Sequence, residues 1–498
     1  MKILLINSNQ LKAPYPVIPI GLCYIASFIE TNGYNVKVLD LCFINDCEKA
    51  IKKAITEFKP TLIGITIRNI DTSSGFKSYF LINDVINNVT SHCKKYFSGP
   101  IVVGGPAVGI NPEEILDYLD LEYAIYGDGE YPFLEFVKRI ENNKIPSGIK
   151  GLIIRKNKKT IEKNDPYYLD NLDMLPFPRP YKYLDLKKYK LYNTNLQIQT
   201  KRGCPLKCSY CTYNNIEGHK FRFKSPDRIA DEIEDTIKNS KIKNIEIVDS
   251  IFNIPIDNAK NVLKAIIKKN IKLNIFSMVI TPKDIDEEFV ELLKKAKVSD
   301  VAVGIESCND RILKNLGKNF QTFDIIKASK VFKKKKIKSI QWFLLLGAEG
   351  ESYSTINETF KSVSKVVSLW DVVFLGIGLR VYNNSPISKR LLQKNNEVTK
   401  NNFFEPFGYE PENIDLKTIK IMALIAFFKY HNFFMYDEKV QLPLFFRLFL
   451  KYVFPKFPLW KPMIYTKFLL KITGVSFIIT KILELIYKEK INKAKKHV

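Results

Sequence analysis

Three cysteines stand at the spacing C-x3-C-x2-C in the segment Thr200-Lys201-Arg202-Gly203-Cys204-Pro205-Leu206-Lys207-Cys208-Ser209-Tyr210-Cys211, whereas the other five cysteines are scattered singly. Cysteine thiolates are the usual ligands of iron–sulfur clusters, and four of them would saturate the irons of a cubane. Three clustered cysteines therefore predict a cluster that leaves one iron open to another ligand.

Two other uses of these cysteines fit the sequence poorly. Structural zinc sites are four-coordinate and pair two short Cys or His units, yet the nearest histidine, His219, lies eight residues past Cys211. A disulfide framework is expected in short secreted chains, and this chain has 498 residues and opens without a charged and then apolar leader. The iron–sulfur interpretation is favoured, and with it a reducing, cytoplasmic setting.

The cysteine spacing, with Arg202-Gly203 before it and an aromatic residue before the last cysteine, resembles the radical S-adenosylmethionine (SAM) enzymes. The resemblance implies that Cys204, Cys208 and Cys211 ligate a [4Fe–4S] cluster and that SAM chelates the open iron through its amino and carboxylate groups. It also implies that the cluster reduces SAM to a 5′-deoxyadenosyl radical, and that Tyr210 lies near the adenine of SAM.

The net charge of +25 is distributed unevenly along the chain. Residues 1–150 carry 15 Lys and Arg against 16 Asp and Glu, whereas residues 439–498 carry 13 Lys and Arg against 2 Glu. Basic character is therefore strongest at the end of the chain, where it indicates an anionic partner or surface.

Residues 1–140 alternate short apolar runs with helix-length stretches. This alternation is typical of a parallel, doubly wound sheet, which binds ligands beyond the carboxyl ends of its strands. We expect strands at 3–6, 36–41, 62–66, 101–104 and 123–126, and helices at 20–31, 47–58, 80–96, 112–119 and 131–142.

Polar residues and glycines gather where these strands end, and glycines let backbone approach a ligand closely. The first strand lacks the G-x-G-x-x-G of dinucleotide folds. The arrangement is similar to the cobalamin-binding domains that precede some radical SAM domains. The resemblance implies cobalamin contacts from Asn7, Asn69, Gly104, Gly105, Gly127, Gly129 and Glu130.

This similarity has one departure. The Asp-x-His-x-x-Gly loop that supplies a histidine to cobalt in many cobalamin proteins is absent, and the only histidine of the segment, His92, falls in an expected helix. Cobalamin is therefore expected to bind without a protein histidine, and the axial ligand is one of the main means by which a protein tunes a metallocofactor. The alternative is a flavodoxin-like domain that binds nothing.

The strand–helix alternation resumes after a connector that contains Leu175-Pro176-Phe177-Pro178-Arg179-Pro180. Six repeats fit the partial (β/α)6 barrel of the radical SAM family, whose chemistry lies at the carboxyl ends of the strands. The expected division is a cobalamin-binding domain at 1–144, a linker at 145–193, a radical SAM domain at 194–400 and a basic, mainly helical region at 401–498. The fold class is therefore α/β, with a helical C-terminal region.

Two segments at barrel strand ends supply further candidates. Gly304-Ile305-Glu306-Ser307 resembles the family segment whose carboxylate bonds the ribose of SAM, which assigns Gly304 and Glu306 to cofactor binding. Glu306 could instead merely favour the start of the next helix. Arg380 follows the last strand, where it could face SAM or substrate as a catalytic residue or be a solvated loop charge.

Residues 403–498 follow neither pattern. An apolar helix is expected at 417–434, and basic aromatic segments at 442–450, 452–460 and 468–487. No apolar run is long enough to cross a bilayer. Helices lying in the membrane interface and a helical cap over the barrel explain this composition equally well, and nucleic-acid binding is disfavoured because no RNA-binding module is present.

The resemblance implies a radical SAM enzyme that uses a [4Fe–4S] cluster, SAM and cobalamin, and most often a methyltransferase acting on an unactivated carbon. The basic end favours an amphiphilic or anionic substrate, lipid or prenyl in type. An electron donor such as flavodoxin or ferredoxin and peripheral membrane contact are the expected partners, with no nucleic acid. Alternatives are cyclisation, rearrangement or C–C coupling with the same cofactors, and a non-catalytic cobalamin- or RNA-binding protein with a structural cluster.

Overall fold

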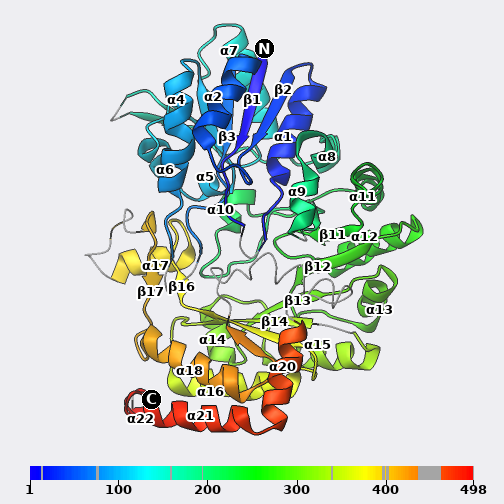
Figure 1. Cartoon of the computed structure of the whole chain (residues 1–498), viewed down its shortest axis with the longest axis vertical. Helices are drawn as coiled ribbons and strands as arrows, with labels where there is room; N and C mark the ends of the chain where they lie inside the picture. Colours follow the sequence, from blue (N-terminus) through cyan, green and yellow to red (C-terminus); the bar gives the residue numbers. More distant parts are fainter. Residues whose placement is uncertain are drawn as a thin grey trace.

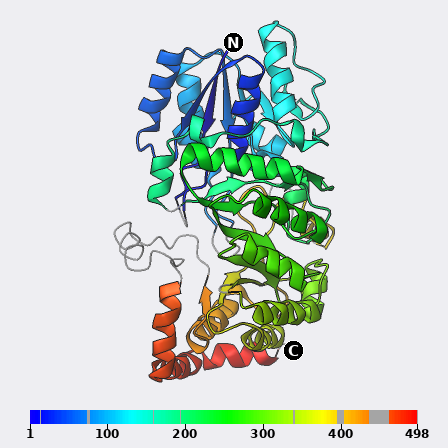
Figure 2. The ribbon, with the colours of Figure 1, turned by 90° about the vertical axis from the view of Figure 1, so that its right-hand side faces the viewer.

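The computed structural model describes residues 1–12, 15–73, 78–157, 160–192, 194–337, 340–394, 399, 403–435 and 461–496. Two seven-stranded sheets lie one above the other along the chain's longest axis (Figure 1). The N-terminal sheet is at one end, and the C-terminal helices are at the opposite end (Figures 1 and 2).

The first sheet has the strand order β2-β1-β3-β4-β5-β6-β7. Its first five strands pair in parallel, and the last two pair antiparallel. The strands are β1 (Lys2–Asn7), β2 (Asn35–Asp40), β3 (Leu62–Thr66), β4 (Ile101–Gly104), β5 (Tyr123–Ile125), β6 (Leu152–Arg155) and β7 (Ile161–Lys163).

Alternate residues of β1 enter two different cores. Leu4 and Ile6 pack into the cluster on one face of the sheet, and Ile3 and Leu5 pack into the cluster on the other. Because side chains alternate along a strand, helices must cover both faces. These helices are α1 (Ile20–Thr31), α2 (Cys47–Phe58), α3 (Ile82–Val85), α4 (Ser91–Tyr96), α5 (Pro106–Ile110), α6 (Pro112–Tyr118) and α7 (Glu130–Glu141).

The structure confirms the five predicted strands of this half and changes two helices. A π-helical turn over 86–90 divides the helix predicted at 80–96, and α5 was not predicted. The hairpin β6–β7 extends the first sheet although its residues lie in the predicted linker. The domain boundaries at 144, 193 and 400 stay predictions.

The second sheet has the order β18-β15-β14-β13-β12-β11-β8, and all its strands are parallel. It curves as a partial barrel with helices on its outer side (Figure 1). The strands are β8 (Leu196–Ile198), β11 (Asn244–Ile247), β12 (Asn274–Ile280), β13 (Val301–Glu306), β14 (Ile340–Leu346), β15 (Val372–Ile377) and β18 (Phe433–Met435). The helices are α11 (Pro226–Ser240), α12 (Ile256–Lys268), α13 (Glu287–Lys295), α14 (Asp310–Asn315), α15 (Thr322–Lys335) and α16 (Tyr353–Val366).

Short elements connect and flank the two sheets. They are the 3-10 turn η2 (Leu172–Met174), α8 (Pro180–Tyr183), α9 (Leu186–Leu191), β9 (Lys201–Arg202) paired with β10 (Arg222–Phe223), α10 (Tyr213–Glu217), β16 (Leu379–Arg380) paired with β17 (Gly408–Tyr409), and α17 (Pro386–Lys394).

The C-terminal region corrects two expectations. The helix predicted at 417–434 ends earlier, as α18 (Leu416–Lys429), because Tyr430 turns to an extended conformation and β18 then joins the barrel sheet. The helical stretch predicted at 468–487 is broken at Gly474, whose φ is +77°, into α20 (Lys461–Ile472) and α21 (Val475–Ile486), followed by α22 (Lys488–Lys496). The predicted segments 442–450 and 452–460 lie outside the described residues. None of the helices in the described part of the chain has the length and apolar character needed to cross a bilayer.

Candidate functional site

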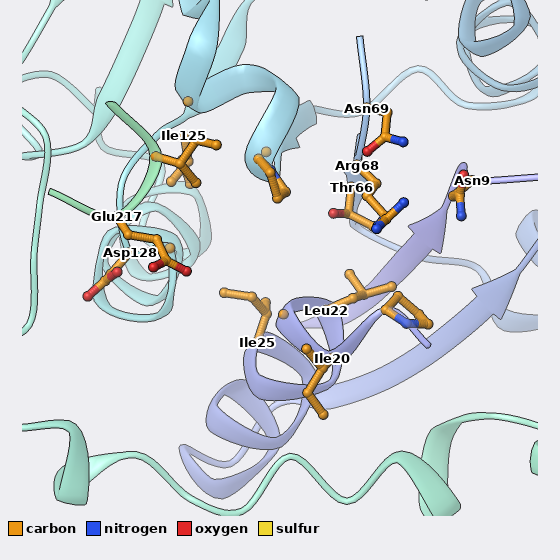
Figure 3. Close-up of a pocket in the computed structure, with 18 of the residues that line it drawn as sticks. Asn9, Ile20, Leu22, Ile25, Thr66, Arg68, Asn69, Ile125, Asp128 and Glu217 are labelled. Carbon is orange, nitrogen blue, oxygen red and sulfur yellow. The ribbon is translucent and has the colours of Figure 1, made fainter. Parts of the chain in front are cut away.

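A cavity of about 540 Å³ lies between the two sheets. On one side it is bounded by the carboxyl ends of β1, β3, β4 and β5, and on the other by residues of the barrel and of the cysteine segment. Figure 3 shows residues from both sides, including Asn69 and Asp128 from the first domain and Glu217 from α10. The cavity is thus at the edge where parallel sheets bind ligands.

The structure brings together all seven residues predicted to contact cobalamin. Each of them lines this one cavity: Asn7, Asn69, Gly104, Gly105, Gly127, Gly129 and Glu130. At Gly105, where φ is +99°, an added Cβ would lie 2.6 Å from Thr66 Oγ1, so only glycine fits the turn after β4.

The residues around the cavity fit a large polar cofactor such as cobalamin. Asn9 lines the cavity, and its buried Nδ2 has no hydrogen-bond partner in the described part of the chain, although such groups are normally paired. His92 lies in α4 and no histidine is among the cavity-lining residues. When bound, cobalamin would supply a cobalt centre that carries a methyl group.

Buried ion pairs join the two sides of the cavity. Arg202, two residues before Cys204, donates from Nη2 to Glu130 Oε1 at 2.6 Å and from Nη1 to Glu130 Oε2 at 3.1 Å. Arg222 pairs with Asp128, which also lies 3.3 Å from Arg202. The start of the cysteine segment is therefore fixed to the first domain.

The three thiols of the cysteine segment are near enough to act on one another electrostatically, and Cys208 also acts on Glu306 at the end of β13. Burial raises the pKa of the Cys211 thiol to about 12, with a further contribution from the neighbouring Cys208 and Cys204. Among the described residues no three His, Cys, Asp or Glu side chains could hold a single metal ion. A cubane binds each thiolate through a different iron, so its ligands need not converge on one point.

Backbone hydrogen bonds fix the loop that carries these thiols. Cys204 N donates to Gly218 O at 3.0 Å, and Ser209 N donates to Leu316 O at 2.8 Å. Gly317, with a φ of +68°, lets the loop approach, because an added Cβ there would lie 2.4 Å from Lys207 O. The cysteines thus lie on a loop whose backbone is held in place, as the ligands of an iron–sulfur cluster require.

Glu306 ends β13 beside the cysteine segment. Its Oε1 accepts from Tyr210 Oη at 3.0 Å and from Lys318 Nζ at 2.9 Å. Burial acts to lower the pKa of Lys318, but Glu306, Tyr210 and Cys208 together raise it well above its usual value. Glu306 has a φ of +58°, a conformation uncommon for a glutamate, which sets it apart from an ordinary helix-start residue.

Arg380 is buried, in contrast to a solvated loop charge. Its Nε donates to Asp71 Oδ2 at 2.7 Å, and its Nη2 donates to Phe403 O at 3.2 Å. These contacts tie a loop of the first domain to the end of the barrel. The guanidinium of Arg380 is thus hydrogen-bonded to groups of the protein itself. A catalytic role for Arg380 stays a prediction.

The predicted site residues did not include Glu217, Asp128, Arg222, Lys318 or Asn9. Glu217 lines the cavity and accepts from Gly203 N at 3.1 Å and from Gln199 Nε2 at 3.1 Å. Burial raises the pKa of its carboxyl to about 7. Asn9 and Asp128 lie within two residues of predicted cobalamin contacts. Arg222 carried no local signal because its partner Asp128 is 94 residues away, and no motif marks the contact of Lys318 with Glu306, 12 residues before it.

Two protein-family models match the sequence. The "B12 binding domain" model matches residues 9–137, and the "Radical SAM superfamily" model matches residues 198–363. It is 26% identical over 350 residues to the uncharacterised methyltransferase PH0819 of Pyrococcus horikoshii, covering 70% of this chain and 73% of that protein. It is 24% identical over 368 residues to the tryptophan 2-C-methyltransferase of Streptomyces laurentii, covering 62% of this chain and 60% of the relative.

The fold is also similar to a solved structure. The radical SAM methyltransferase TsrM from Kitasatospora setae, with cobalamin and a [4Fe–4S] cluster bound, superposes with a TM-score of 0.73 at 24% identity, covering 79% of this chain and 78% of TsrM. A B12-binding domain followed by a radical SAM domain implies cobalamin, a [4Fe–4S] cluster and SAM as cofactors. The chain belongs to the cobalamin-binding-domain radical SAM enzymes.

Proposed function

We propose that the protein is a methyltransferase that methylates an unactivated carbon of an amphiphilic or anionic substrate. One observation carries this proposal: a single cavity is lined on one side by the predicted cobalamin contacts and on the other by Thr212 and Tyr213, which directly follow Cys211. The sites for the two cofactors therefore face each other across a space in which a substrate carbon can be held.

The chain's own groups position the two cofactor sites. The buried pair Arg202–Glu130 fixes the spacing between the cysteine segment and the first domain. Glu306, held by Lys318 and Tyr210, presents a carboxylate that suits the hydroxyls of a ribose. Together these residues would orient SAM and exclude water, while SAM and cobalamin supply the radical and the methyl group.

The side chains on the inner face of the barrel sheet suggest that part of the substrate is apolar. Along β14, Trp342, Leu344 and Leu346 pack toward the outer helices, so Phe343 and Leu345 face inward and stay only half-buried. Phe343 stacks on Phe374 of β15 with ring centroids 5.1 Å apart. An aliphatic or ring-fused substrate would bury this surface favourably.

The proposed function also requires an electron donor and includes contact with a membrane surface. An electron donor of the flavodoxin or ferredoxin type would reduce the cluster, and a cytoplasmic location with peripheral membrane contact fits the basic C-terminal region. A predicted contact with SAM from Gly304 belongs to the same proposal.

The test uses the reconstituted enzyme under anaerobic conditions with a reductant, SAM carrying a trideuterated methyl group, and organic-soluble extracts of the source cells. The proposal predicts a product heavier by one trideuteromethyl group, attached to carbon. A new product that lacks the label, formed together with 5′-deoxyadenosine, would instead indicate cyclisation or rearrangement. SAM left intact with every extract would favour a non-catalytic protein.

A further inference from the structure

The last helices of the chain are oriented with their apolar side outward. On α21, the buried residues are Ser476 and Thr480, which are 7% and 6% exposed. On the opposite side, Ile478, Ile482 and Leu485 are 59%, 48% and 69% exposed. Residues at spacing i, i+4 and i+7 share one helix face, so these three form a continuous stripe.

Helix α20 repeats this inversion. Its Lys467 is buried, and Nζ donates to the carbonyl oxygen of Tyr430 at 3.2 Å while lying 3.7 Å from the ring centroid of Phe427. Leu469 and Ile472 are 62% and 66% exposed. Nine of the 19 exposed large apolar side chains of the described residues lie in α20, α21 and their junction, which marks a patch rather than scattered exposure.

A second cavity, of about 470 Å³, opens beside this stripe. It lies between α16, α18, α21 and α22, at the opposite end of the molecule from the cobalamin-binding domain (Figures 1 and 2). Its walls include the apolar side chains of Phe360, Met422 and Ile425. Leu485 belongs both to the cavity wall and to the exposed stripe, so the two surfaces are continuous.

Five lysines surround this cavity, with a single glutamate. They come from the four helices α16, α18, α21 and α22: Lys361, Lys429, Lys481, Lys488 and Lys495, with Glu484. In the described part of the chain, Lys481 is the one member of the five with an ion-paired carboxylate, that of Glu484 at 3.1 Å. The cavity therefore combines apolar walls with uncompensated positive charge at its rim.

We propose that α20, α21 and α22 dock on an anionic phospholipid bilayer, and that the cavity receives the phosphate-bearing headgroup of one phospholipid. The exposed stripe would enter the acyl boundary of the membrane, as interfacial helices with a basic side do. The lysines would contact the phosphate and the negative surface potential of the leaflet. The charge of the rim favours phospholipid over a second copy of this chain, which would bring the same lysines together.

The experiment measures co-sedimentation of the full-length, cofactor-loaded protein with phosphatidylcholine vesicles, with and without phosphatidylglycerol. Binding is expected only with phosphatidylglycerol and is expected to fall as salt is raised. The double variant Ile478→Asp, Leu485→Asp is expected to lower vesicle partitioning by about 10-fold or more. Its matched control is Ile145→Asp, Phe323→Asp, which places two charges on exposed apolar sites elsewhere and should bind as the wild type does.

A second pair of variants tests the cavity itself. Lys361→Ala, Lys429→Ala removes charge from α16 and α18, across the cavity from the stripe, and is expected to weaken binding by about 10-fold. Lys144→Ala, Lys187→Ala makes the same change of net charge at exposed positions far from the cavity and should have no effect.

Several results would overturn the proposal. Equal binding to both vesicle types, or to neither, would remove the anionic bilayer as partner, and an unaffected Lys361→Ala, Lys429→Ala variant would remove the headgroup cavity. A dimer in sedimentation velocity that the Asp variants dissociate would identify a second copy as the occupant. Vesicle binding is read without any methyl transfer, so its failure is separate from a failure of the proposed function.

Discussion

Arg202 and Glu130 form a two-pronged ion pair that links the cysteine segment to the first helix turn of α7, with both side chains less than one-tenth exposed. A buried pair of this kind is weak evidence for added stability, but breaking it leaves an uncompensated charge. The position of this pair is important because it links the cysteine segment to the residues that are predicted to contact cobalamin.

Replacing Glu130 by Ala should therefore lower the free energy of unfolding by about 3 kcal/mol, since Asp128, which Arg222 already pairs with, would be the carboxylate left beside Arg202. Urea unfolding followed by circular dichroism measures the change. Glu135→Ala, which breaks the solvent-exposed pair with Arg139 on the same helix, should cost less than about 1 kcal/mol. Equal losses in the two variants would contradict a special role for the buried pair.

Gly317→Ala should prevent the cysteine loop from closing, because the added Cβ would collide with the carbonyl oxygen of Lys207. We expect a large loss of iron after anaerobic reconstitution. Gly148→Ala is a close control, since Gly148 has a φ of +72° but open space around its Cβ position. It should cost about 1 kcal/mol of stability and retain its iron. A Gly317→Ala protein with full iron content would refute this account of the loop.

Glu306→Gln should weaken SAM binding by about 10-fold while leaving iron content unchanged, because a carboxylate is the stronger acceptor for ribose hydroxyls. Lys318→Met should also weaken SAM binding, because the carboxylate of Glu306 would lose the hydrogen bond from Lys318 that orients it. Lys314→Met, at an exposed position of α14, serves as the control. Equilibrium binding of SAM to the reconstituted protein gives the answer, and unchanged affinity in both variants would remove Glu306 from the SAM site.

Glu351 links stability to pH. It is fully buried, its Oε2 accepts from Ala348 N at 3.0 Å, and burial raises the pKa of its carboxyl to about 7. Between its ordinary pKa of about 4.3 and about 7, the folded chain holds a proton that the unfolded chain has lost, so the free energy of unfolding falls as pH rises through this window.

Glu351→Gln should remove that contribution, which amounts to about 2 kcal/mol between about pH 5 and 7. Urea unfolding at several pH values compares the two slopes. Glu217 shifts in the same direction and stays in both proteins, so part of the slope should remain. A variant with the wild-type slope would show that Glu351 ionises normally in the folded chain.

Much of the fold and of the cavity followed from the sequence. Buried parallel strands are continuous apolar runs, so Leu62–Thr66 and Ile101–Gly104 were located to the residue. Ligands bind at the carboxyl ends of parallel strands, and this rule predicted Asn7, Gly105 and Glu130 as contacts. All three line one cavity.

The remaining features depend on contacts between distant parts of the chain. Strand β18 has three residues and is stable only because β15 offers it a free edge. Lys318 contacts Glu306 and also Tyr210, which is 108 residues away along the chain, and neither the spacing nor the composition around Lys318 signals these contacts. The outward orientation of the apolar face of α21 could not be predicted either. Periodicity shows that a helix has an apolar face, but not whether that face points to the core or to the outside.

One measurement shows directly whether the chain holds both cobalamin and a SAM-cleaving cluster. The protein is reconstituted anaerobically with iron, sulfide and hydroxocobalamin, desalted, and then analysed for metals and for 5′-deoxyadenosine after addition of SAM and reductant. We expect stoichiometric cobalt, about four irons per chain and SAM cleavage. SAM cleavage by a protein that retains no cobalt would show that the first domain does not hold cobalamin.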